Sequence, residues 1–204
     1  EEKYPVRDMG NGKVRSAGVA MAMQGSCISN IDVGSARVRL NDDGSFTLMI
    51  GAADMGTGCD TILAQMAAEI MDCRLEDVAV FGADTDASPY DSGSYASSTT
   101  YVTGKAVELA CDKLKKQMCR IGAQLLGCTP EEVEFQAGKI VNPATGESVT
   151  ASQVGCKSQL NSDEAAEATA SHASPVSPPP FMVGMVEIEL DRLTGLVTVL
   201  DYMA

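Results

Sequence analysis

Apolar and polar residues alternate on both sides of the segment NDDGS, over residues 34–41 and 45–51. Alternation with a period of two is typical of strands that bury one face. Asp43 and Gly44 form a dipeptide that favours the positive φ angles of a tight turn. This pattern predicts a β-hairpin.

The spacing becomes helical in the segment CDTILAQMAAEIMDC, where four apolar residues fall on one face: Ile62, Leu63, Met66 and Ile70. This spacing predicts a helix over residues 60–71, with Asp60 as its N-terminal cap. Farther along, the apolar run VAVFG predicts a buried strand over residues 78–82.

A longer helical pattern runs from Val102 to Leu125, and Gly127 is expected to end that helix. The segment TPEEV then has the form of a capped turn. The segment VEFQAGKIVNPATGESV predicts a further hairpin, with turns at Gly138 and Gly146.

The last part of the chain changes in composition. Residues 155–180 contain few apolar residues and end in SPVSPPPF, which predicts an extended connector. The segment MVEIELDRLTGLVTVLDYMA predicts a second alternating hairpin, with its turn near Thr194 and Gly195. It is similar to the earlier hairpin, either because hairpins share these features or because the chain contains a duplicated unit.

Together these elements predict an α+β fold in which mixed sheets and hairpins pack with helices. Four segments are expected along the chain. They are a loop-rich entry over residues 1–33, an α/β unit over 34–154, the connector over 155–180, and a terminal hairpin over 181–204 that returns to the sheet.

Charge and composition narrow the function. The chain carries 15 basic and 28 acidic residues, a net charge of −13, so a nucleic-acid backbone would be repelled. No apolar run approaches the roughly 20 residues that span a bilayer, so no membrane segment is expected. The first residues have neither the basic start nor the apolar stretch of a secretory signal, which favours the cytoplasm.

The cysteine and histidine residues give no indication of a metal site. The seven cysteines are an odd number and include no CxxC pair, which argues against an iron–sulfur or zinc site and favours reduced, mostly buried thiols. The one histidine, His172, lies in a Ser/Ala/Pro-rich stretch and is expected to be a solvated loop residue. The sequence predicts no catalytic residue and no metal ligand.

Two loops have the composition of ligand sites. Gly56, Thr57 and Gly58 immediately precede a predicted helix, where free backbone N–H groups and the helix dipole favour an anion. The alternative is a plain turn between a strand and a helix. This segment, the glycine loop, has neither a Walker motif nor the full GxGxxG spacing.

The second loop, DSGSYASSTTYVTG, also places small and hydroxyl residues ahead of a helix. These hydroxyls can donate hydrogen bonds to a ligand, or one of them can cap the helix. Two such loops in one chain favour a shared ligand that carries phosphate.

Three segments in order carry a family resemblance: DGSFTLMIGAADMGTGCDTILAQMAAE, DTDASPYDSGSYASSTTYVTGKAV and SPPPFMVGMVEIELDRLTG. They resemble the molybdenum-binding subunit of the xanthine dehydrogenase/aldehyde oxidoreductase family, from about residue 15 to the end. The resemblance implies a mixed α/β fold and a molybdopterin cofactor, as molybdenum-molybdopterin or its cytosine dinucleotide form. It also implies partners that carry 2Fe–2S clusters and FAD.

Carried over residue by residue, the resemblance places cofactor contacts in two sets: Gly56, Thr57 and Gly58, and then Tyr95, Ala96, Ser97, Ser98 and Thr99. Many relatives have glutamine where this chain has Thr57, and some have arginine where it has Ser98. Both departures shorten the side chain, so backbone N–H groups or water are expected to replace those contacts. The form of the cofactor stays open.

The resemblance places the family's catalytic glutamate beyond Ala204 and its substrate-orienting arginine before residue 1. We therefore expect a part of a catalytic subunit that completes its site with the rest of that subunit. The implied substrate is a purine, a related heteroaromatic ring or an aldehyde. The alternative is a non-catalytic module that binds a small molecule or a partner. Under the first hypothesis, the chain by itself is expected to be inactive and to self-associate.

Overall fold

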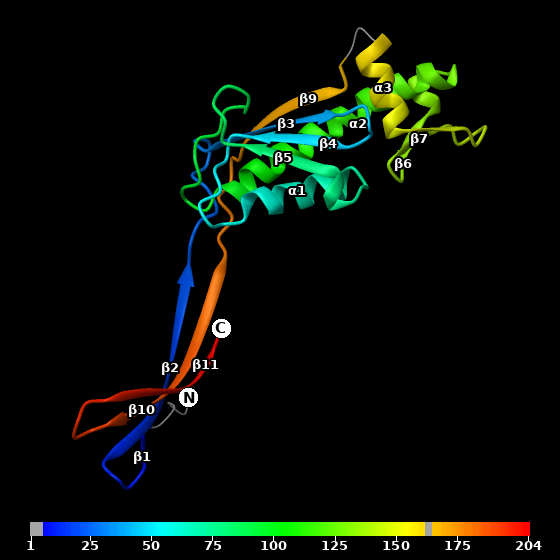
Figure 1. The fold of residues 1–204 in the computed structure, drawn as a ribbon. Coiled ribbons are helices and arrows are strands. Elements are labelled where there is room, and N and C mark those ends of the chain that lie inside the picture. The colour runs from blue at the N-terminus through cyan, green and yellow to red at the C-terminus, as the bar shows by residue number, and fades with distance from the viewer. Residues whose placement is uncertain (1–5, 162–164) are drawn as a thin grey trace. The chain divides into compact units, whose positions relative to one another are not determined.

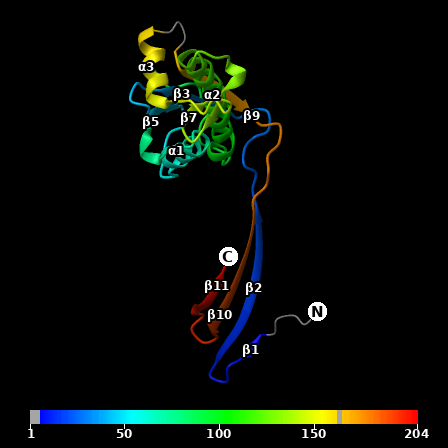
Figure 2. The same cartoon turned by 90° about the vertical axis from the view of Figure 1, so that its right-hand side faces the viewer.

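The computed structural model describes residues 6–161 and 165–204 (Figures 1 and 2). They fall into two compact units. Residues Ser26–Ser177 form the first, which we call the α/β unit. The second, the sheet unit, combines the chain up to Gly25 with Pro178–Ala204.

The α/β unit is built on a four-stranded sheet with the strand order β5-β4-β3-β9. Its strands are β3 (Val33–Leu40), β4 (Phe46–Ile50), β5 (Val78–Gly82) and β9 (Glu167–Ala173). β3 pairs antiparallel with β4 and β9, whereas β4 and β5 are parallel. A parallel pair needs a crossover connection, and the helix after β4 provides it.

Two helices cover one face of this sheet (Figure 1). They are α1 (Cys59–Ile70) and α2 (Gly104–Leu126), and a π-helical turn, η2 (Thr99–Thr103), leads into α2. Alternate strand residues point toward the helices and are almost fully buried, because apolar side chains leave water there. The largest of these strand residues are Val38, Leu40, Phe46, Leu48 and Ile50.

A small three-stranded sheet packs near the far part of α2. Its strands are β6 (Glu134–Gln136), β7 (Lys139–Val141) and β8 (Ser148–Thr150), and α3 (Ala151–Asn161) follows them. Two single 3₁₀ turns, η1 (Leu75–Asp77) and η3 (Pro130–Glu132), join the larger elements.

The sheet unit has four strands in the order β1-β2-β10-β11. They are β1 (Arg7–Asp8), β2 (Lys13–Met23), β10 (Phe181–Asp191) and β11 (Val197–Met203). β2 and β10 pair antiparallel over their whole length, from Phe181 opposite Met23 to Asp191 opposite Lys13. No described helix belongs to this unit, and most of its apolar side chains are exposed.

Several predicted elements are confirmed to within a residue or two. The hairpin over 34–41 and 45–51 is β3 and β4, the strand over 78–82 is β5, and the helix over 60–71 is α1. Gly127 ends α2 with a φ of 68°, as its place in the pattern indicates. The α+β architecture of mixed sheets with helices is also confirmed.

The structure differs from the expected organisation in the last part of the chain. The predicted connector over 155–180 contains most of α3 and the whole of β9. The alternating residues of the segment EATASHA are too small to indicate a strand, and pairing with β3 makes it one. The hairpin over 181–204 pairs with β2 and does not return to the sheet of the α/β unit.

The cysteines are free thiols, but burial varies more than expected. Cys27, Cys59 and Cys111 are buried, three others are half-buried, and Cys156 is exposed. None of the helices in the described ranges is long and apolar enough to cross a bilayer.

Candidate functional site

The two loops singled out from the sequence begin at the same edge of the sheet. β4 and β5 run parallel, so their carboxyl ends meet there. β4 continues through residues 51–58 into α1, and β5 continues through residues 83–98 into η2 (Figure 1). The topology therefore brings together two segments that the sequence separates.

The glycine loop turns tightly before α1. Gly56 and Gly58 have φ angles of 98° and 73°, a region that side chains rarely adopt. Both amides donate to one carboxylate oxygen, Asp54 Oδ1, at 2.8 Å from Gly56 and 3.2 Å from Gly58. Gly58 is the N-cap of α1, and the predicted cap, Asp60, lies in the first turn without capping it.

This arrangement alters the expected anion site. The Gly56 and Gly58 amides lower the pKa of Asp54 below its ordinary value, so its carboxylate is charged near neutral pH. A negative group of the protein itself thus accepts the N–H groups that were expected to face a phosphate. Asp60 adds a second carboxylate at the same helix end.

The outer side of the glycine loop remains open. A Cβ atom built on Gly56 or Gly58 would meet no atom within 4 Å. Thr57, which lies between them, is exposed. The positive φ angles already require glycine, and the open face in addition lets another molecule approach the backbone closely.

The second loop, which we call the serine loop and which covers residues 91–98, is tightly folded. Ala96 and Ser97 have φ angles of 51° and 57°, an uncommon conformation for residues with a side chain. Ser98 is buried, and its hydroxyl donates to the Gly93 carbonyl oxygen at 3.2 Å. No side-chain hydrogen bond caps η2 or α2, so these hydroxyls do not serve as a conventional helix cap.

Hydrogen bonds connect the two loops. Thr99 Oγ1 donates to Ser94 Oγ at 2.9 Å, and Ser94 Oγ donates to the Ala53 carbonyl oxygen at 3.4 Å. Ala53 immediately precedes Asp54, so the serine loop contacts the base of the glycine loop. Ser94 is therefore the residue through which the two loops are hydrogen-bonded.

Asp91 ties the serine loop to the π-helical turn. Its Oδ2 atom accepts a hydrogen bond from Thr103 Oγ1 at 2.8 Å, and its Oδ1 atom accepts one from the Gly93 amide at 2.8 Å. Thr103 in turn packs closely on Gly34 of β3. Single π turns occur often at functional sites.

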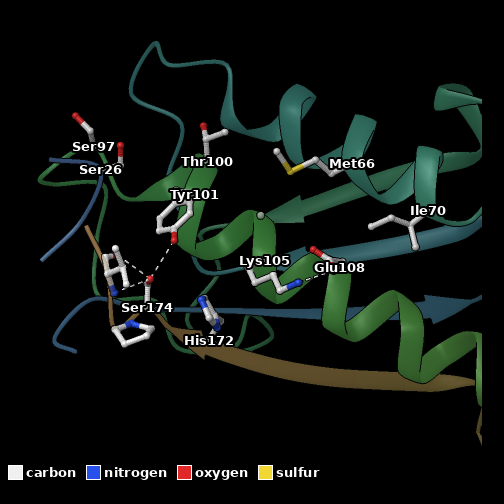
Figure 3. A pocket seen from close by; sticks show the side chains of 13 residues that line it. Ser26, Met66, Ile70, Ser97, Thr100, Tyr101, Lys105, Glu108, His172 and Ser174 are labelled. Carbon is white, nitrogen blue, oxygen red and sulfur yellow. Dashed lines mark hydrogen bonds and ion pairs between the residues drawn. The ribbon is translucent and has the colours of Figure 1, made fainter. Parts of the chain in front are cut away.

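A cavity of about 870 Å³ lies beside the serine loop (Figure 3). Ser97 and Thr100 line one part of it, and Met66 of α1 lines another. Figure 3 shows Tyr101 and Ser174 pointing toward one another, and their hydroxyl oxygens are 3.1 Å apart. The glycine loop contributes no lining residue, so the cavity does not collect all eight predicted contacts.

The prediction that His172 is a solvated loop residue is wrong. It lies on β9, is half-buried and lines this cavity (Figure 3). Ala168 and Ala170 precede it on the same face of the strand, and both are buried beneath α2. The period-two spacing of these residues was a signal for the strand, although their small size hid it.

One cluster of ionisable groups lies at the start of α1. Among the described residues, Asp54, Cys59 and Asp60 form the one group spaced for a metal ion. Burial raises the pKa of the Cys59 thiol, which disfavours the thiolate that binds metals. Burial also raises the pKa of Cys73 to about 11 and that of Cys111 to about 12, so both stay protonated.

Comparison with solved structures defines the class of fold. Quinoline 2-oxidoreductase from Pseudomonas putida 86 superposes with a TM-score of 0.80 over 94% of this chain and 27% of that one. The two sequences are 22% identical, so this likeness concerns the fold alone.

The family model for the molybdopterin cofactor-binding domain matches residues 1–204, and this chain belongs to that family. It is 34% identical over 179 residues to a probable hypoxanthine oxidase of Escherichia coli strain K12, covering 87% of this chain. It is 37% identical over 112 residues to the aldehyde oxidoreductase molybdenum-binding subunit of the same strain, covering 55% of this chain. The chain spans 19% and 15% of those relatives' lengths.

Proposed function

We propose that this chain is the part of a molybdenum hydroxylase catalytic subunit that holds molybdopterin. The observation that carries this proposal is the pair of hydrogen-bonded loops at one sheet edge, in a chain of the molybdopterin-binding family. When bound, molybdopterin supplies the oxidation and reduction chemistry, and the protein supplies binding and orientation.

The residues proposed to hold the cofactor are Gly56, Thr57, Gly58, Tyr95, Ala96, Ser97, Ser98 and Thr99. They fit such a group because the open faces of Gly56 and Gly58 leave room for a planar ring system near the backbone. Tyr95 and Ser97 are exposed, whereas Ser98 is buried and acts by fixing the loop. Thr57 offers a hydroxyl on a short side chain, at the position where the family resemblance implies a longer glutamine.

These residues orient the ligand without moving protons. Among the described residues of the two loops, no nucleophilic side chain is paired with a neighbouring base. The carboxylate of Asp54 is already engaged by two backbone amides. We therefore assign binding and positioning to this chain. The rest of the subunit supplies the groups that act on the substrate.

The proposed substrate is a purine, a related heteroaromatic ring or an aldehyde, to which oxygen from water is added. The relatives named hypoxanthine oxidase and aldehyde oxidoreductase support this range. The proposed partners are the rest of the subunit and subunits or domains with 2Fe–2S clusters and FAD. A relative described as a subunit of a dehydrogenase complex supports an assembly of this kind.

A valine at Gly58 tests the site, because Gly127 provides a matched control. Their φ angles are 73° and 68°, and neither glycine has an atom within 4 Å of a built Cβ. Each substitution is expected to cost about 1–2 kcal/mol of backbone strain. In the full subunit, Gly58→Val should also lower molybdenum and pterin content roughly tenfold, a difference of about 1.4 kcal/mol in binding.

Gly127→Val should leave the cofactor content unchanged at the same loss of thermal stability. Equal losses of molybdenum in the two variants would contradict the assigned site. A full subunit that contains neither molybdenum nor pterin would instead favour a non-catalytic binding module.

A further inference from the structure

The glycine loop surrounds a single carboxylate oxygen. Asp54 Oδ1 accepts the Gly56 amide at 2.8 Å and the Gly58 amide at 3.2 Å, so the chain closes a ring around it. Both glycines have left-handed backbone angles, and Thr57 between them is exposed. The carboxylate thus fixes the conformation in which Thr57 faces outward.

We propose that Asp54 is a positioning residue for the cofactor, holding the glycine loop by accepting both amides on one oxygen. This inference rests on the proposed function. Asp54 contacts the loop backbone and orients the residues on either side of Thr57, whereas those residues contact the ligand.

The same geometry specifies which part of a ligand the glycine loop accepts. The Gly56 and Gly58 amides point at a carboxylate of the chain, and Asp60 lies in the adjacent helical turn. A phosphate here would face two negative groups and find two donors already engaged. The loop would therefore fit the uncharged ring system of molybdopterin better than its phosphate.

The effect of Asp54 extends to the serine loop. The neighbouring Ala53 carbonyl oxygen accepts the Ser94 hydroxyl, and Ser94 accepts the Thr99 hydroxyl. If Asp54 releases the glycine loop, the Ala53 carbonyl loses its fixed direction. Both sets of proposed contacts then shift together, although Thr99 is 45 positions away in the sequence.

A merely structural role would make Asp54 equivalent to other turn aspartates of this chain. Asp191 provides the comparison, because its Oδ1 atom accepts the Leu193 amide at 2.8 Å and the Thr194 amide at 3.1 Å. These bonds also lower the pKa of Asp191. This turn joins β10 to β11 in the sheet unit, away from both loops in the sequence.

The test uses Asp54→Ala, Asp54→Asn and Asp191→Ala in the full subunit. Asparagine keeps one carbonyl oxygen that can accept both amides, so it separates the acceptor from the charge. Molybdenum and pterin content, the melting temperature and amide hydrogen exchange at Gly56 and Gly58 are measured for each variant. Exchange at these amides reports the loop geometry without depending on activity.

Asp54→Ala should accelerate exchange at both glycines and weaken cofactor retention roughly tenfold or more, since two hydrogen bonds to a charged group are lost. Asp54→Asn should keep exchange slow and retain cofactor within about twofold, a difference below about 0.5 kcal/mol. Asp191→Ala should lower the melting temperature alone.

Full cofactor retention in Asp54→Ala with fast exchange would overturn the positioning role. Equal cofactor loss in Asp54→Asn with slow exchange would also overturn it, because charge and not the acceptor would then decide. Absence of molybdopterin from the unmodified subunit would overturn the proposed function itself, which this comparison distinguishes from a failure of Asp54 alone.

Discussion

The two units differ in how far they bury their apolar side chains. In the α/β unit, helices α1 and α2 cover the sheet, and residues such as Leu48 and Leu114 have no exposed surface. In the sheet unit, Val14 is the one described apolar side chain that is buried. Met21, Phe181 and Val199 are each at least 60% exposed.

This difference concerns how each unit is stabilised, because among the described residues only the α/β unit has a continuous apolar core. Burying apolar surface is the dominant favourable term in folding, and the α/β unit does so within one continuous core. The sheet unit exposes directly opposed apolar pairs on β2 and β10, among them Met21 with Val183. Such a patch is typical of a surface that another protein segment covers.

Core truncations should separate the two units most strongly. Leu48→Ala in β4 should destabilise the α/β unit by about 2–5 kcal/mol, because it leaves a cavity among helices that cannot close in fully. Val199→Ala on the exposed face of β11 should change stability by less than about 0.5 kcal/mol. Denaturant unfolding of the two variants measures both values, and similar losses would erase the contrast.

Two strand glycines sharpen the same contrast. Gly34→Ala should cost about 1–3 kcal/mol, because the new Cβ would lie 2.7 Å from the Thr103 backbone. Gly18→Ala should be neutral or stabilise by up to about 1 kcal/mol, since its nearest neighbour is a Val186 methyl at 3.9 Å. Thermal unfolding gives both signs. A harmless Gly34→Ala would mean that η2 moves freely on β3.

Self-association should depend on the sheet unit alone. We expect the 204-residue chain to form dimers or larger species through its exposed apolar strands. Met21→Lys combined with Val183→Glu replaces one apolar pair by opposite charges on facing strands, which keeps the pairing favourable. Light scattering should then show a larger monomer fraction. An unmodified chain that is strictly monomeric would contradict this expectation.

The smallest effect concerns the charges that join β2 to β10. Glu189 accepts from Lys13 at 2.8 Å and from Arg15 at 2.9 Å, and these bonds lower the pKa of Glu189. Because the folded pKa lies below the unfolded one, this stabilisation is complete above the ordinary glutamate value and is lost as pH falls through the lowered pKa.

Glu189→Gln should therefore lower the melting temperature slightly at neutral pH and have little effect in strong acid, where the native glutamate is protonated too. The basic partners Lys13 and Arg15 are partly exposed to solvent, so these ion pairs contribute modestly and added salt should also shrink the difference. A difference that persists in strong acid would assign the effect to packing and not to charge.

Local signals in the sequence predicted much of the fold. Helix α1, the β3–β4 hairpin and the end of α2 at Gly127 follow from periodicity and turn chemistry that neighbouring residues contain. The two loops were located for the same reason, since clusters of glycine and serine ahead of a helix are visible without any structure. The sequence does not indicate the proposed role of Asp54, because it does not distinguish an aspartate in a ligand-binding turn from an aspartate in any other turn.

The sequence by itself determined the elements whose residues interact with near neighbours, and the family motifs that lie within them. Only the tertiary structure decided that β9 pairs with β3, that the last hairpin joins β2, and that the parallel β4 and β5 bring both loops to one edge. These pairings join residues far apart in the chain. They are made by backbone hydrogen bonds, so the order of side chains along the sequence does not indicate which strands will pair. For that reason His172 was predicted as a loop residue, although the fold places it in a strand beside a cavity.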